Sequence, residues 1–65
     1  MDRQTADRNK LRVENTFRVI DLMEDIRDIW RETTPLQNLS DDAKEKVLEK
    51  IEKARKALEK IEATL

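Results

Sequence analysis

The chain of 65 residues contains no glycine and a single proline, Pro35, close to its middle. Glycine and proline mark hairpin turns and irregular loops, so a chain almost without them favours long helices. The residue before a proline is pushed out of the α region, and Thr34 therefore marks a helix end. We expect an all-α fold in which helices of about 5–33 and 41–64 are joined by a turn at 34–40.

The short turn predicts that the second helix returns antiparallel to the first. Ser40 is the expected cap of the second helix, with Asp41 and Asp42 in its first turn, where the helix dipole favours acids. The whole chain, 1–65, is therefore interpreted as a single domain, an antiparallel two-helix hairpin.

So small a chain needs additional stabilisation, because a lone core of this size rarely contributes more than about 3–5 kcal/mol. With no cysteine or histidine in the sequence, disulfides and the commonest metal ligand are excluded. Association is the remaining means of stabilisation. We expect two hairpins to pair into a four-helix bundle, which makes a homodimer the first hypothesis.

The stretch Val13–Trp30 carries more apolar surface than one partner helix can cover. At about 100° of rotation per residue it resolves into two stripes. The first has the width of an ordinary core face and is predicted to pack on the second helix. Its main members are Val19, Leu22, Ile26 and Ile29. The second stripe runs at a slant, and Leu48 of the second helix flanks the same edge. The predicted interface residues are Val13, Phe17, Ile20, Met23, Trp30 and Leu48.

The second helix contains three related heptads, EKVLEKI (45–51), EKARKAL (52–58) and EKIEATL (59–65). A seven-residue apolar repeat is typical of coiled-coil packing. It predicts core a positions at Ile51, Leu58 and Leu65, and core d positions at Val47, Ala54 and Ile61.

The antiparallel register expected from these heptads places Leu22 at the level of Ile51. Asp25 and Lys50 then flank one side of the hairpin, so that this edge is charged and the opposite edge is apolar. We expect the apolar edge to make the contacts with a partner.

Charge and hydropathy restrict the possible partners. Fourteen basic residues stand against fifteen acidic ones, a net charge of −1, which argues against a polyanion as the partner. No apolar run approaches the roughly 18–20 residues that cross a bilayer, and no signal-peptide pattern is present. We expect no membrane association and a cytoplasmic protein.

Neither a catalytic, a cofactor-binding nor a metal site is predicted. Without histidine, cysteine or glycine there is no nucleophile–base pair and no phosphate loop, so we do not expect an enzyme. Two acidic pairs, Asp25 with Asp28 and Glu49 with Glu52, have the spacing of Mg²⁺ sites in all-α nucleotide pyrophosphohydrolases. Both pairs point away from the predicted core, whereas such a site lines a bundle interior.

The leading hypothesis is a non-catalytic helical interaction module that binds itself or another protein through the apolar edge of the first helix. An alternative is an engineered helical binder or scaffold that presents this helix to a protein target. Six of the seven arginines precede the turn and six of the seven lysines follow it. The second helix is rich in strong helix formers, as in de novo designed proteins.

The chain length and the two-helix plan are similar to those of the ROP family, dimeric four-helix bundles that bind RNA. This resemblance implies an RNA-binding regulator as a further alternative. It rests on architecture alone, and no residue role is transferred because no sequence motif matches. Arg8, Arg12 and Arg18 scatter around the predicted helix axis, which weighs against nucleic acid as the partner.

Overall fold

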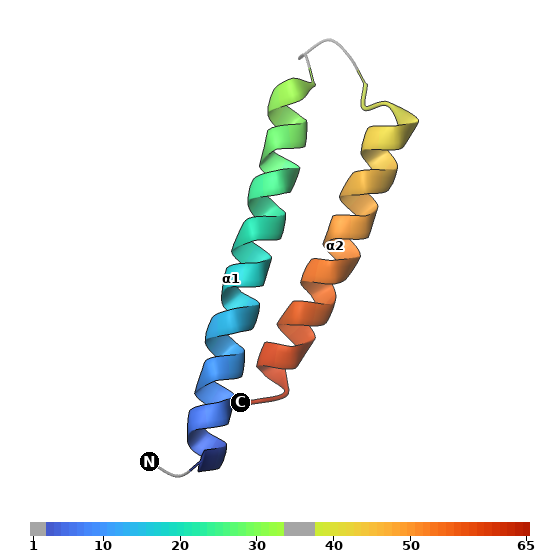
Figure 1. The fold of residues 1–65 in the computed structure, drawn as a ribbon. Coiled ribbons are helices and arrows are strands. Elements are labelled where there is room, and N and C mark those ends of the chain that lie inside the picture. The colour runs from blue at the N-terminus through green and yellow to red at the C-terminus, as the bar shows by residue number, and fades with distance from the viewer. Residues whose placement is uncertain (1–2, 34–37) are drawn as a thin grey trace.

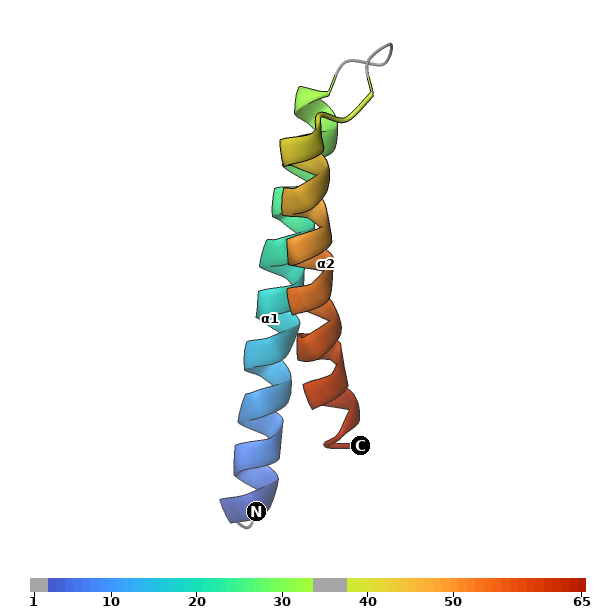
Figure 2. The same ribbon diagram turned by 90° about the vertical axis from the view of Figure 1, so that its right-hand side faces the viewer.

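The computed structural model describes residues 3–33 and 38–65. It contains two helices, α1 (Arg3–Glu32) and α2 (Asp41–Glu62), which run side by side in opposite directions (Figure 1). The hairpin is long and thin, with extents of 54 × 15 × 14 Å, and a view turned by 90° shows the two helices stacked along the line of sight (Figure 2). The predicted all-α hairpin is confirmed. Most of the predicted turn, residues 34–37, lies outside the described residues.

The start of α2 follows directly from its first residues. The hydroxyl of Ser40 accepts a hydrogen bond from the amide of Ala43 at 3.1 Å, while its extended backbone (φ −65°, ψ 159°) leads into the helix. Asp41 and Asp42 occupy the first turn, where the helix dipole favours their charge. The predicted cap is therefore confirmed, and α2 ends two residues earlier than expected, at Glu62.

Four residues are buried in the contact between the described helices, and two of them are alanines. The buried residues of α2 are Val47, Ala54 and Ala57, and Ile26 is the buried residue of α1 among those described. The other members of the predicted α1 stripe, Val19, Leu22 and Ile29, are half-buried beside it.

The prediction that the a positions of α2 form the core of the hairpin is wrong. Ile51 is 38% exposed, Leu58 is 52% exposed and Leu65 is 89% exposed. Ala57 lies in the contact at 2% exposed, because α2 turns Ala54 and Ala57 toward α1. Small side chains let two helix backbones approach closely, so the larger residues are displaced to the edge of the contact.

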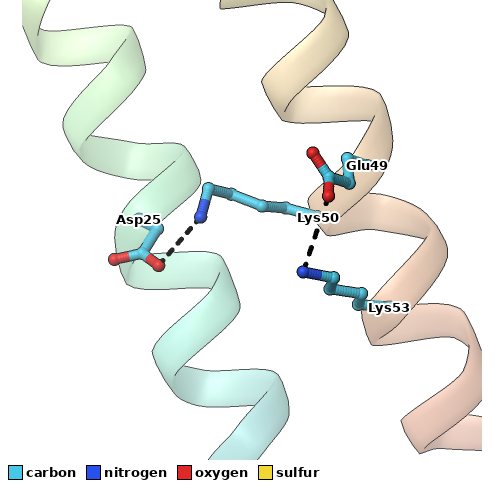
Figure 3. A network of polar contacts seen from close by, with 4 residues as sticks. All are labelled: Asp25, Glu49, Lys50 and Lys53. Atoms are coloured by element: carbon cyan, nitrogen blue, oxygen red, sulfur yellow. Dashed lines mark hydrogen bonds and ion pairs between the residues drawn. The ribbon is translucent and has the colours of Figure 1, made fainter.

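Two polar contacts tie the helices together at different levels. Lys50 Nζ reaches across from α2 to Asp25 Oδ2 at 3.1 Å, as the sequence predicted, while Lys53 pairs with Glu49 within α2 (Figure 3). Near the C-terminus, Arg12 Nε donates to the Thr64 hydroxyl at 2.7 Å, and a second guanidinium nitrogen donates to the Thr64 carbonyl. These contacts fix the register of the antiparallel pair.

Candidate protein interface

The six predicted interface residues are all exposed. Each shows between 46% and 62% of its surface to solvent, and Phe17 is the most exposed of them. Phe17 and Trp30 are the two aromatic residues of the sequence. Aromatic rings concentrate binding energy at protein interfaces, and an exposed patch that contains both of them favours a contact surface.

The same surface includes three further residues, which the sequence predicted to lie in the core of the hairpin. Two of them lie on α2 and the third lies just beyond it. Ile51, Leu58 and Leu65 follow one another at seven-residue spacing and are exposed. The ion pair of Asp25 with Lys50 marks the opposite edge of the hairpin. Helical spacing places the α1 stripe and the α2 row together on the edge away from this pair. We call this surface the apolar face: Val13, Phe17, Ile20, Met23, Trp30, Leu48, Ile51, Leu58 and Leu65.

Polar side chains interrupt the apolar face. On α1, Glu24 and Arg27 join Val19, Ile20 and Met23 around a shallow groove of about 300 Å³. On α2, Arg55 lies between Ile51 and Leu58 along the helix, and Arg55 Nη1 is 3.6 Å from Glu52 Oε2. The apolar face thus has charged groups within reach of its edges, as interface rims do.

The end of the apolar face near the turn contains Trp30. Its ring borders an open hollow that is also lined by Thr33, Asn38, Leu39 and Lys44. Leu39 is half-buried there. A large aromatic ring on an open hollow can be covered further by a partner side chain.

The two acidic pairs with the spacing of a Mg²⁺ site lie on the exposed surface, and each carboxylate is close to a basic side chain. Asp25 pairs with Lys50, and Asp28 lies 3.5 Å from Arg27. Glu49 and Glu52 are both 3.6 Å from their basic neighbours on α2. In residues 3–33 and 38–65, no three metal-ligating side chains gather into one group.

One contact of the hairpin was not predicted from the sequence. Arg12, read there as one of several scattered surface bases, is half-buried and holds the end of α2 through Thr64. Its guanidinium also donates to the Asn9 side chain at 3.1 Å. The antiparallel register alone could have placed Arg12 near the last turn of α2, where bases complement the exposed carbonyls.

The described part of the chain has no helix of the length and apolarity needed to cross a membrane. Comparisons of the sequence with protein-family models and with curated proteins, and of the fold with solved structures, found no match.

Proposed function

We propose that the protein is a non-catalytic helical interaction module that associates with a second copy of itself through the apolar face. The observation that carries this proposal is the exposure of nine large apolar side chains on the two helices and the C-terminal end, away from the edge of the Asp25–Lys50 pair. Soluble monomers rarely leave so extended an apolar surface in contact with water.

The total surface of the chain supports an additional contact. The hairpin exposes 5592 Å², whereas a compact monomer of 7.7 kDa exposes about 4,300 Å². The difference, about 1,300 Å², exceeds the roughly 800 Å² that each partner contributes to an interface of standard size. A second hairpin laid on the apolar face would bring the chain toward the surface area of a compact protein.

The radius of gyration also supports an additional contact. It is 15.6 Å, against about 11 Å for a compact domain of 65 residues. A two-helix pair cannot enclose a core from all sides, so its apolar side chains become fully buried only when further helices are added.

A second copy is the partner that the charges favour. With a net charge of −1, two copies repel each other weakly over long range, and a net charge near zero promotes association. A symmetric dimer also needs no second gene product to cover the surface, because the same patch serves both subunits.

Sedimentation equilibrium with matched variants tests the proposal. The unmodified chain should sediment as a dimer at micromolar concentration, and Phe17→Asp should shift it to monomer because each face would acquire a buried charge. Arg18→Asp introduces the same side chain one residue away, on the charged side of α1, and should leave the dimer intact.

An unmodified chain that remains monomeric and fully helical across the concentration range would contradict self-association. A different protein, including the target of an engineered binder, would then be the better occupant of the apolar face.

A further inference from the structure

We infer that the second copy docks with its turn at the same end as the turn of the first, so that α1 of each subunit packs on α2 of the other. This inference rests on the proposed self-association and adds the arrangement of the two subunits. It is carried by the charges along the outer edges of the apolar face.

The outer edge of α2 is acidic. Three glutamates at seven-residue spacing form a row beside Leu48, on the side away from the contact with α1. All three are exposed, and Glu62 lies beside this row at the last turn of α2. With the row of Leu48 included, the edge has five acids and one base: Asp41, Glu45, Glu52, Arg55, Glu59 and Glu62.

The outer edge of α1 has the opposite sign. Phe17 shares a row at seven-residue spacing with Lys10, Glu24 and Arg31, and Arg27 lies beside this row. The four charged residues are exposed. Asp28 lies at the same angle around α1 as Lys10, five turns further along, and is 3.5 Å from Arg27. The α1 edge thus has three bases and two acids.

Two arrangements lay one apolar face on the other with two-fold symmetry. When the axis is parallel to the hairpin, both turns lie at one end and α1 packs on α2 of the partner. When the axis is perpendicular to it, the turns lie at opposite ends and each helix packs on its own copy. The first arrangement joins edges of opposite sign. The second lays the acidic edge of α2 against itself, and like charges across an interface disfavour pairing.

The two-fold axis parallel to the hairpin also fixes the register between the subunits. A rotation about this axis keeps each residue at its level along the hairpin, so the two subunits cannot slide past each other. Residues then meet the partner at the level set within each hairpin by the Asp25–Lys50 and Arg12–Thr64 contacts. Phe17 reaches the level of Leu58 of the partner subunit. This level therefore has a large apolar side chain from each subunit.

The same register brings one pair of opposite charges and one pair of like charges to the rim on each side of the contact. Arg31 reaches the level of Glu45 of the partner subunit, and symmetry repeats the pair. Glu24 meets Glu52 of the partner subunit, whose charge is offset by Arg55 at 3.6 Å in the same chain.

Pulsed dipolar EPR on single-cysteine variants tests the arrangement, since the chain has no cysteine of its own. A spin label at Asn38→Cys reports the turn end, and one at Asp21→Cys reports the middle of α1; both residues are exposed. With turns at the same end, the two labels at position 38 should lie roughly 20–30 Å apart, the width of a four-helix bundle. With turns at opposite ends they should lie roughly 50 Å apart, from a rise of 1.5 Å per residue.

The label at position 21 separates failure of the arrangement from failure of the dimer. It gives a dipolar signal below about 40 Å in either arrangement, because both keep the middles of the subunits together. A signal at position 21 with a long distance at position 38 would overturn the arrangement and keep the dimer. No dipolar signal at either position would overturn both proposals.

A charge exchange at the rim tests the same inference by a second measurement. Arg31→Glu should raise the dissociation constant of the dimer about 3- to 10-fold, because near the turns it places two acids against each other on each side of the contact. The double variant Arg31→Glu with Glu45→Arg should restore it.

Arg18→Glu, on the charged side of α1, is the matched control and should leave the dissociation constant unchanged. An unchanged or lower dissociation constant for Arg31→Glu would overturn the inference, because helices packed on their own copies would lose a repulsion between bases.

Discussion

Ala54 and Ala57 decide how the two helices meet. They are 6% and 2% exposed, while the larger Ile51 and Leu58 on the same helix stay at the surface. An alanine in a helix contact brings two backbones together without the loss of rotamer freedom that longer side chains suffer. The consequence for function is direct, because the same rotation that buries the alanines extends the apolar face onto α2.

Enlarging Ala57 should therefore destabilise the hairpin. Ala57→Leu forces extra methylenes into a closed contact and should lower the free energy of unfolding by about 1–3 kcal/mol. Chemical unfolding followed by far-ultraviolet circular dichroism measures the change. Ala6→Leu, at an exposed position of α1, adds the same volume and should stay within about 0.5 kcal/mol of the unmodified chain. Equal effects of the two variants would show that the contact at Ala57 is loosely packed.

At the scale of the element, α1 and α2 differ in their local stabilisation. α2 has a serine cap, two acids in its first turn and Lys60 in its last turn, all of which favour a helix locally. α1 has no acid in its first turn and includes β-branched residues such as Val13 and Thr16. The stability of α1 therefore depends more on its contacts with other helices. This dependence agrees with the larger share of the aromatic side chains on α1.

The cap of α2 can be tested directly. Ser40→Ala removes the acceptor for the Ala43 amide and should cost about 1 kcal/mol of stability. Ser40→Asp keeps an acceptor at the same place and should remain close to the unmodified chain, again by chemical unfolding. If the aspartate variant lost as much stability as the alanine variant, the hydroxyl bond would not be what stabilises the start of α2.

At the scale of the whole molecule, a hairpin of two thin layers has too little interior for its apolar surface. The four residues that are buried in the described part of the chain include two alanines. The five ion pairs between described residues do little to compensate, because most of their side chains are more than half exposed and such pairs contribute little. Folding and association are therefore expected to be coupled.

Coupling makes the melting temperature depend on concentration. Raising the protein from low to high micromolar concentration should raise the melting temperature, since mass action stabilises whatever binds the folded state. Trp30 emission should shift to shorter wavelength over the same range as the ring becomes covered. The melting temperature of Phe17→Asp should not vary with concentration. A melting temperature of the unmodified chain that is equally constant would argue against coupled assembly.

The sequence by itself determined the local structure of this protein. The absence of glycine, the position of Pro35 and the cap at Ser40 define two helices, and the periodicity of α1 identified Ile26 as a core residue and Phe17 and Trp30 as exposed. These features depend on residues close together in the chain, where propensity, capping and helical spacing decide. The antiparallel pairing of Asp25 with Lys50 also followed from spacing, because the turn is short.

Only the tertiary structure decided how α2 is rotated about its axis. The row of Val47, Ala54 and Ile61 belongs to two possible apolar seams, one continued by Ile51 and Leu58 and the other by Ala57. The first is apolar at each seven-residue step from Ile51 to Leu65, whereas Lys50 and Thr64 flank Ala57 in the second, so periodicity alone favours the seam that the hairpin does not use. Close packing of the two backbones favours the alanine seam. This preference depends on α1, and the heptads of α2 contain no information about α1. It leaves Ile51, Leu58 and Leu65 beside the slanted stripe of α1, and so completes the apolar face.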